Sequence, residues 1–355
     1  MIRFVGALFL SGILSLATAR ADKLTLVAGG GDGSDGTAAV GAKLNGPFGV
    51  DFDKSGRMLI VEMVGQRVRM VDKSGTISTI AGAGQKGSSG DGGPADAAMF
   101  NGMHSLAIKH DLYVSDTWNN RVRKLDFATG RIFNFAGTGK SGFSGDGGPA
   151  SKAEFGGIYC IAFDPSGRHM YLADLDNRRI RAIDMKTGIV RTVAGNGKRG
   201  VPADGAEAIS APLVDPRAVA ADGDGNVYIL ERGGNALRVV DSQGKIRTLA
   251  GTGKAGAGGD GGDAKHAQLH GPKHLCVDRD GSVLIADTEN HLIRRYQPRD
   301  GKIVRVAGTG KKGSAGLGGD PLQAELSQPH GVYIHSSGEL YISDSSNDRV
   351  LKIER

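Results

Sequence analysis

The stretch YVSDTWNNRVR (113–123) is one of six related copies of the same sequence in this chain. Close versions are YLADLDNRRIR (171–181), LIADTENHLIR (284–294) and YISDSSNDRVL (341–351). The acid at the fourth position recurs at intervals of 54 to 58 residues, at Glu62, Asp116, Asp174, Glu231, Asp287 and Asp344. A fixed period of this length indicates one supersecondary unit repeated around or along an axis.

Each copy carries four strand patterns. In the first copy, residues 49–53 and 57–61 are short runs separated by a turn, 67–71 alternates polar and apolar residues, and 76–81 completes the set. Strands joined by such short turns are antiparallel. Four antiparallel strands in each of six units, without a helical segment of ordinary length, predict an all-β fold, a six-bladed β-propeller. A linear β-solenoid is the alternative architecture.

The two ends of the chain complete one another. The last copy stops after its third strand, at residues 350–354, so its fourth strand is missing. Residues 23–29 (KLTLVAG) match the fourth-strand pattern of 247–251 (RTLAG). We therefore expect the N-terminal strand to pair with the last blade and close the ring. The propeller is predicted to occupy residues 22–355 as one domain.

The first 21 residues differ from the rest of the chain. Arg3 is followed by an apolar run at 4–16, and small residues precede two cleavage positions, after Ala19 or Ala21. This pattern predicts a signal peptide over 1–21 and a secreted or periplasmic protein, with an uncleaved N-terminal anchor as the alternative. The run is short for a bilayer span, and no other segment is apolar for long enough to cross a membrane.

The charge distribution and the cysteines limit the kinds of partner and of cross-link that we expect. The net charge is +6, and the cations recur in every repeat instead of gathering in one block. Such a distribution does not favour nucleic acid as a ligand, and we expect a monomer. Cys160 and Cys276 fall on the first strands of units three and five. Those strands are not neighbours, so two buried free thiols are expected in place of a disulfide.

The repeat core, with Thr-x-Ala-Gly-x-Gly between copies, resembles the NHL repeat over about residues 23–355. The linker SGDGGPA at 144–150, seen again at 89–95, resembles that of many secreted bacterial NHL proteins. The resemblance implies the propeller fold but no single function, because binding modules and enzymes share it. Cytoplasmic NHL propellers include RNA-binding proteins, and the predicted signal peptide argues against that role. Arginines seven residues after the acids are expected to pair with acids: Arg69, Arg123, Arg181, Arg238 and Arg294.

The residue just before each first strand is expected at one mouth of the central channel. These positions differ between blades, so the fold does not impose them. They are Phe48, His104, Tyr159, Arg217, Lys273 and His330. His274, the next residue after Lys273, is expected one position further along its strand. Imidazoles, a phenol and two cations favour an anionic or carbonyl-bearing ligand. The first hypothesis is therefore a secreted binding module for a protein, peptide or glycan.

The second hypothesis is a metal-assisted lyase or hydrolase. The sequences QPHGV (328–332) and GMHSL (102–106) resemble the zinc-binding steps of the amidating lyases, six-bladed NHL enzymes that hold zinc with three histidines at this mouth. The resemblance implies a metal on His104 and His330. Blade four has Arg217 where the third histidine is expected, and His274 is the candidate substitute.

Two further sites are weaker. Gluconolactonase-like propellers share the architecture but use Asn and acidic metal ligands, and none of the six mouth positions is Asn, Asp or Glu. A lactonase-like site built from Glu62 or Glu231 is left open. The SGDGG-type linkers offer Asp91, Asp146 or Asp260 to Ca²⁺, one carboxylate in each loop.

Overall fold

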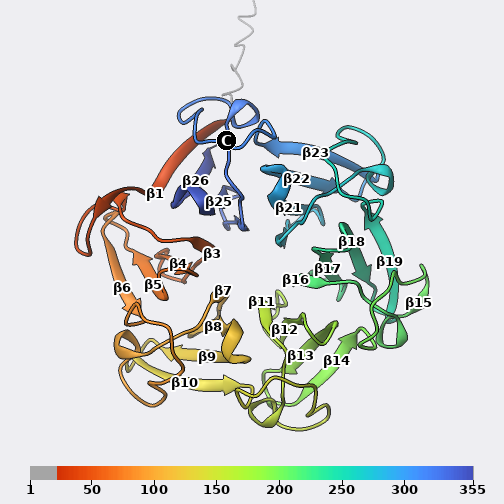
Figure 1. Ribbon diagram of the computed structural model, residues 1–355, viewed down its shortest axis with the longest axis horizontal. Helices are drawn as coiled ribbons and strands as arrows, with labels where there is room; N and C mark the ends of the chain where they lie inside the picture. The colour runs from red at the N-terminus through yellow and green to blue at the C-terminus, as the bar shows by residue number, and fades with distance from the viewer. Residues whose placement is uncertain (1–21, 355) are drawn as a thin grey trace, which may run out of the picture.

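The computed structural model describes residues 22–354, and the predicted signal peptide lies outside them. Six sheets are arranged around a central axis (Figure 1), and their strands are antiparallel except where the short β2 pairs in parallel with β1. Four sheets have four strands, and two carry a short fifth strand at the outer edge. In each blade the first strand lies innermost, and successive innermost strands contact one another around the ring. The predicted six-bladed propeller is confirmed, and the solenoid alternative is wrong.

The blades have these bounds. Blade one is β3 (Pro47–Phe52), β4 (Met58–Glu62), β5 (Arg67–Val71) and β6 (Ile77–Ala81), and blade two is β7 (Met103–Ile108), β8 (Leu112–Asp116), β9 (Arg121–Asp126) and β10 (Arg131–Ala136). Blade three is β11 (Ile158–Phe163), β12 (His169–Asp174), β13 (Arg179–Asp184) and β14 (Val190–Ala194). Blade four is β16 (Pro216–Ala221), β17 (Val227–Glu231), β18 (Ala236–Val240) and β19 (Lys245–Ala250), with β15 (Ala206–Glu207) at its edge.

Blade five is β20 (His274–Val277), β21 (Val283–Asp287), β22 (Leu292–Gln297) and β23 (Lys302–Ala307). Blade six is β24 (Gly331–Ile334), β25 (Leu340–Asp344), β26 (Arg349–Glu354) and β1 (Lys23–Gly33), with β2 (Val40–Ala42). Short 3₁₀ turns are η1 (Ala95–Ala97), η2 (Thr117–Asn119), η3 (Ala150–Lys152), η4 (Ala208–Ser210), η5 (Ala264–His266), η6 (Thr288–Asn290), η7 (Pro321–Gln323) and η8 (Ser345–Asn347).

The ring closes through its two ends. Strand β1 pairs antiparallel with β26, placing Leu24 opposite Ile353 and Gly29 opposite Arg349. Leu24 is fully buried at this seam. The pairing supplies the fourth strand that the last repeat lacks and removes the open edge that a solenoid would expose. The predicted closure is confirmed.

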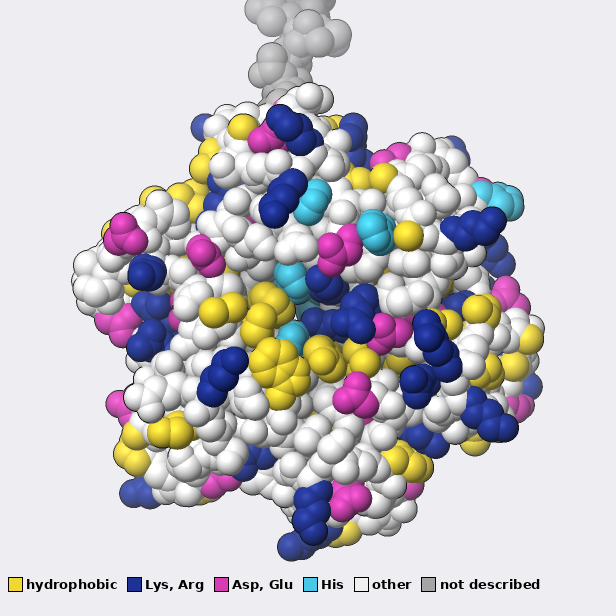
Figure 2. Space-filling model, in the orientation of Figure 1, with side chains coloured by type: hydrophobic (Ala, Val, Ile, Leu, Met, Phe, Trp, Pro, Cys, Tyr) yellow, Lys and Arg dark blue, Asp and Glu magenta, His cyan; other side chains and the backbone are white. Residues whose placement is uncertain are grey.

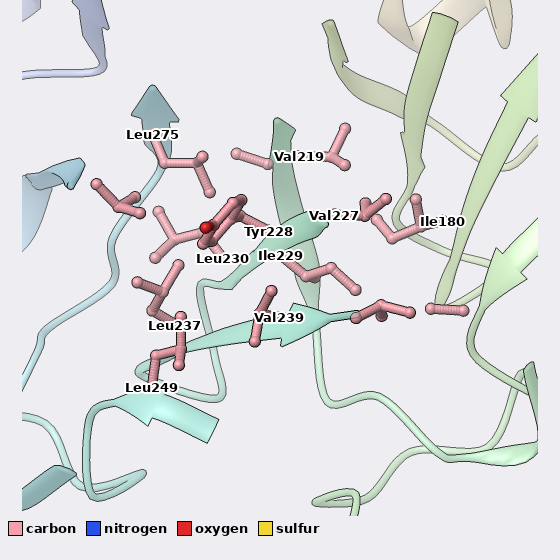
Figure 3. Packing of buried hydrophobic residues seen from close by; sticks show 14 of the residues in the cluster. Ile180, Val219, Val227, Tyr228, Ile229, Leu230, Leu237, Val239, Leu249 and Leu275 are labelled. Atoms are coloured by element: carbon pink, nitrogen blue, oxygen red, sulfur yellow. The ribbon is translucent and has the colours of Figure 1, made fainter. Parts of the chain in front are cut away.

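The core lies between neighbouring blades. Figure 3 shows one such layer, in which Ile180 of blade three, Val219 and Ile229 of blade four, and Leu275 of blade five belong to one buried cluster. These strands are rich in Val, Ile and Leu because sheets covered on both faces need apolar residues on both sides. Burying one such side chain contributes about 1.5–3 kcal/mol.

The chain turns sharply after the second strand of each blade, and we call this turn the corner. A buried acid at the end of that strand stabilises the corner through hydrogen bonds. In blade two, Asp116 Oδ1 accepts the backbone N–H of Asn101 at 2.8 Å, and the amide of Asn119 donates to Asp116 and to the carbonyl of Gly87. Blades one and four have Glu with Gly in place of Asp with Asn. A Cβ at Gly234 would lie 2.8 Å from Glu231. The longer acid therefore occupies the space that Asn fills elsewhere, which explains why the two replacements occur together.

The predicted pairing of the repeated arginines is confirmed. Buried Arg181, for example, bonds Asp174 of its own blade at 3.4 Å and Asp146 of the preceding linker at 2.8 Å. Asp91 and Asp260 bond arginines in the same way. The three linker carboxylates that were candidates for Ca²⁺ are therefore engaged by guanidinium groups.

Two other expectations concern cysteines and membranes. Cys160 and Cys276 are both free thiols, as predicted, although Cys276 is only partly buried. Within residues 22–354, no helix is long and apolar enough to cross a membrane.

Candidate functional site

The six predicted mouth positions lie at one end of the central channel. Four of them are the second residues of β3, β7, β11 and β16, and two directly precede β20 and β24. We call this set the mouth ring: Phe48, His104, Tyr159, Arg217, Lys273 and His330. In blades one to four the pairing of the first strand with the second is irregular at this position. Such bulges redirect side chains, here at the channel mouth.

Aromatic contacts join four members of the mouth ring. Phe48 stacks on His330 with ring centroids 4.0 Å apart, and meets His104 edge-on at 5.2 Å. The His104 ring in turn meets Tyr159 edge-on at 4.7 Å. The structure therefore brings together residues from blades six, one, two and three that lie far apart in the sequence.

Both mouth imidazoles are held in one orientation. His104 Nδ1 lies 2.7 Å from the carbonyl oxygen of Gly102, and His330 Nδ1 lies 2.8 Å from that of Gln328. Because a carbonyl oxygen only accepts, Nδ1 carries the hydrogen and Nε2 keeps its lone pair in the neutral ring. Burial, with a smaller contribution from Arg217, holds the pKa of His104 well below its usual range. Burial acts likewise on the pKa of His330, together with Lys273 and Arg217.

Arg217 is a buried cation without an acidic partner. The side chain is 5% exposed, and its guanidinium lies over the ring of Tyr159, 4.4 Å from the centroid. Within residues 22–354 it forms no salt bridge, and its buried Nε has no hydrogen-bond partner. The nearby Asp215 bonds Arg232 instead. Burial lowers the pKa of Arg217 to about 10, so it remains a cation at neutral pH.

Lys273 differs from Arg217 because its charge is neutralised. Its ammonium lies 2.7 Å from a carboxylate oxygen of Glu289, and the amide of Gln328 donates to the other oxygen at 3.0 Å. Sequence reasoning missed Glu289 and Gln328. Glu289 occupies the second variable position of a corner, and these corner residues project towards the mouth. The place of Glu289 in the corner was the one feature of the sequence that could have identified it.

Trp118 is the other residue that sequence reasoning missed. It is the single tryptophan of the chain, lies in the corner of blade two and is 44% exposed. Its ring meets His104 edge-on at 5.6 Å, and its Nε1 donates to the Tyr159 hydroxyl at 3.4 Å. Figure 2 shows apolar side chains to the left of and below the central hollow, and a group of Lys and Arg side chains on its right.

His274 lies below the mouth ring, inside the channel. It lines a cavity of about 290 Å³ formed by the innermost strands of all six blades. Its Nδ1 accepts the backbone N–H of Val332 at 3.4 Å, and burial lowers its pKa to about 4. This bond directs Nδ1 along the channel wall. His274 is therefore part of the inner channel rather than of the rim.

The described residues hold no group of three or more His, Cys, Asp or Glu side chains arranged to bind a metal. A metal on His104 and His330 would thus have two ligands from the protein, fewer than catalytic zinc sites use. The free Nε2 atoms fit metal binding chemically, and also fit hydrogen-bond donors of a ligand. The metal site stays a prediction.

A larger cavity lies away from the mouth. It has about 550 Å³ and lies at the outer side of blade one, where Glu62, Arg69 and Asp35 line it. Arg69 bonds both carboxylates, and Glu231 is bonded to Arg238 in the same manner. The two acids left open for a lactonase-like site are therefore engaged in holding the corners.

Comparison with known proteins bears on the repeat and the fold. The family model described as "NHL repeat" matches residues 269–296 and 326–353, which contain the first three strands of blades five and six. The chain contains NHL repeats. Its six blades are copies of the unit that these two segments represent.

The NHL propeller has relatives of greater length. It is 30% identical over 287 residues to the Arabidopsis thaliana "Protein SUPPRESSOR OF QUENCHING 1, chloroplastic", covering 76% of this chain and 27% of the relative. It is 26% identical to the Gallus gallus "NHL repeat-containing protein 2", covering 86% of this chain and 46% of that protein. The chain thus spans less than half the length of these curated relatives.

Solved structures show the same fold at low identity. A protein described as an auxiliary nutrient binding protein from Bacteroides thetaiotaomicron aligns with a TM-score of 0.67 and 15% identity, over 94% of this chain and 76% of the other. Virginiamycin B lyase from Staphylococcus aureus aligns with a TM-score of 0.52 and 14% identity, over 94% and 99%. At this identity the likeness concerns the fold alone.

Proposed function

We propose that this propeller is an exported binding module whose channel mouth holds an anionic group of a protein, peptide or glycan. The observation that carries the proposal is Arg217. A buried guanidinium without an acidic partner costs stability, and an anion from outside would remove that cost. Residues 22–354 offer no carboxylate in ion-pair contact with it.

The other mouth residues suit this role. Both imidazoles are oriented by backbone carbonyls, so they accept hydrogen bonds through Nε2. The mouth ring is fixed by strand bulges and by ring contacts, so little side-chain entropy is lost when a ligand binds. A solved propeller of the same fold is described as a nutrient binding protein, which is consistent with a binding role.

Isothermal titration with a simple carboxylate tests the proposal. Propanoate should bind wild-type protein saturably, and Arg217→Met should weaken binding about tenfold or more because a charge-assisted hydrogen bond is lost. Arg131→Met, an exposed arginine on the outermost strand of blade two, is the matched control and should leave binding unchanged. Binding that survives Arg217→Met intact would refute the proposal.

The second candidate is a metal-assisted lyase or hydrolase centred on His104 and His330. The free Nε2 atom of each ring favours it. When bound, a zinc ion would supply a Lewis acid that polarises a carbonyl or hydroxyl oxygen. Metal analysis of purified protein separates the two functions. Stoichiometric zinc that is lost on double substitution of the two histidines supports the enzyme. A metal-free preparation of the wild-type protein would refute this second candidate function.

A further inference from the structure

The channel mouth has two chemically different halves. Blades one to three contribute the rings of Phe48, His104 and Tyr159, and blade two adds the exposed indole of Trp118. Blade four contributes the guanidinium of Arg217. In Figure 2 the apolar side chains lie to the left of and below the central hollow, and a group of Lys and Arg side chains lies on its right. A ligand that used the whole mouth would need both an apolar and an acidic part.

The apolar half is built for a flat group. Gly102, at φ +69°, has no side chain, and a Cβ there would lie 2.4 Å from the Trp118 ring. Only glycine therefore lets the indole lie against the backbone at this point. The indole is held by its bond to the Tyr159 hydroxyl, yet 44% of Trp118 is exposed. A rigid, partly exposed aromatic surface next to a channel offers a stacking contact to another ring.

The two halves meet at Tyr159. The guanidinium carbon of Arg217 is 4.4 Å from the centroid of the Tyr159 ring, and the Trp118 Nε1 bonds the hydroxyl of that same ring. One phenol ring thus separates the cation from the exposed indole. The acidic group of a ligand and its apolar ring would accordingly be a few bonds apart.

The charge of the ligand follows from the charges around it. Lys273 is neutralised by Glu289 at 2.7 Å, and the two mouth imidazoles are neutral at pH 7. Arg217 is then the single uncompensated cation of the mouth ring, and Lys86, 5.8 Å from the Trp118 ring, lies outside that ring on the indole side. One negative charge balances it, and a second would be left buried without a partner.

We propose that the mouth binds a monocarboxylate whose acidic group lies a few bonds from an aromatic ring, with the carboxylate on Arg217 and the ring on Trp118. This inference rests on the proposed function and adds the class of ligand. Two sources share this chemistry: a small aromatic acid, and the free C-terminus of a peptide that ends in an aromatic residue.

Three matched compounds test the two requirements. The acid 3-phenylpropanoate carries ring and charge, 3-phenylpropanamide carries the ring alone, and propanoate carries the charge alone. Because Trp118 is the single tryptophan, its fluorescence reports occupancy of the mouth, and calorimetry confirms the affinity. The acid should bind at least about tenfold more tightly than either partial compound.

Substitutions assign the two contacts. Arg217→Met should weaken binding of 3-phenylpropanoate about tenfold or more, and Arg217→Lys, which keeps the charge, should weaken it less. Trp118→Ala, followed by calorimetry, should weaken it about three- to tenfold without changing propanoate binding. Phe143→Ala removes an exposed ring that lies under Arg179, away from the mouth ring, and is the control.

The outcomes are separable. If propanoate binds as tightly as 3-phenylpropanoate and still depends on Arg217, the aromatic requirement is wrong and the proposed function stands. If the amide binds as well as the acid, or no carboxylate binding depends on Arg217, both are wrong. A peptide ending in free phenylalanine, compared with its C-terminal amide, identifies the source. Tighter binding than 3-phenylpropanoate supports a peptide end, and weaker binding supports a small acid.

Discussion

Replacing Arg217 by methionine should stabilise the ligand-free protein. Burial lowers the pKa of Arg217 to about 10, from an ordinary value near 12.5. A pKa difference of one unit corresponds to about 1.4 kcal/mol, so the folded protein destabilises the charged form of Arg217 by about 3 kcal/mol. The contact of the guanidinium with the Tyr159 ring, 4.4 Å from the centroid, and the long bond that its Nη1 donates to the Tyr159 carbonyl at 3.4 Å together return about 1–2 kcal/mol. The net expectation for Arg217→Met is a gain of about 1–2 kcal/mol in the free energy of unfolding.

The same substitution at Arg238 is the matched control. Arg238 is equally buried, but it lies 2.5 Å from the buried carboxylate of Glu231 and also bonds Thr248. Arg238→Met would leave Glu231 without its cation, which costs about 3–5 kcal/mol. Two buried arginines of one propeller should therefore respond to one substitution with opposite signs.

Urea unfolding of the purified variants, followed by circular dichroism, measures both effects. The midpoint should rise for Arg217→Met and fall for Arg238→Met. A loss of stability in Arg217→Met comparable to that in Arg238→Met would mean that Arg217 is paired in solution. The reasoning that this cation is kept for a ligand would then be refuted.

Three further outcomes are expected. Carboxylate affinity should stay constant between about pH 6.5 and 8.5, because the pKa values of both mouth histidines lie well below their usual range; a step in calorimetric affinity near pH 6.5 would show that one titrates there. Gly234→Asn should cost about 1–3 kcal/mol by crowding Glu231, and adding Glu231→Asp should recover most of it in a double-mutant cycle. Leu24→Ala at the closing seam should lower unfolding free energy by about 2–5 kcal/mol, whereas Val40→Ala, 54% exposed, should change it by less than about 0.5 kcal/mol; equal effects would contradict the closure.

The sequence was sufficient for the fold because the repeat is regular and its two ends are complementary. The missing fourth strand after residues 350–354 and the matching pattern at 23–29 predicted the pairing of β1 with β26. Alignment of the copies also grouped the six residues of the mouth ring, since residues at the same place in each repeat lie at the same end of their strands. That these residues bind a ligand stays a prediction. These inferences needed only the period and the order of the strands.

The chemistry of the mouth needed the structure. Trp118 and Glu289 sit in corners whose direction depends on a following residue in the left-handed conformation, such as Asn120 at φ 52° and His291 at φ 56°. The neutral state of the mouth histidines depends on burial and on nearby cations such as Arg217 and Lys273. The carbonyl two residues before each ring decides only that Nδ1 carries the hydrogen. The joint occurrence of Glu231 and Gly234 is one steric replacement, and only the distance between the two residues shows it.

Quenching of Trp118 fluorescence by small ions tests the central claim most directly, because this single tryptophan lies at the rim. Lys86, 5.8 Å from the indole, is first replaced by methionine so that the remaining field comes from the mouth. Each quenching constant is divided by that of free N-acetyltryptophanamide at the same ionic strength, because iodide and caesium quench indole with different intrinsic efficiencies. The ratio for iodide should exceed the ratio for caesium, and adding Arg217→Met should bring the two ratios together. Equal ratios before that substitution, or an iodide preference that survives it, would contradict an anion-binding mouth.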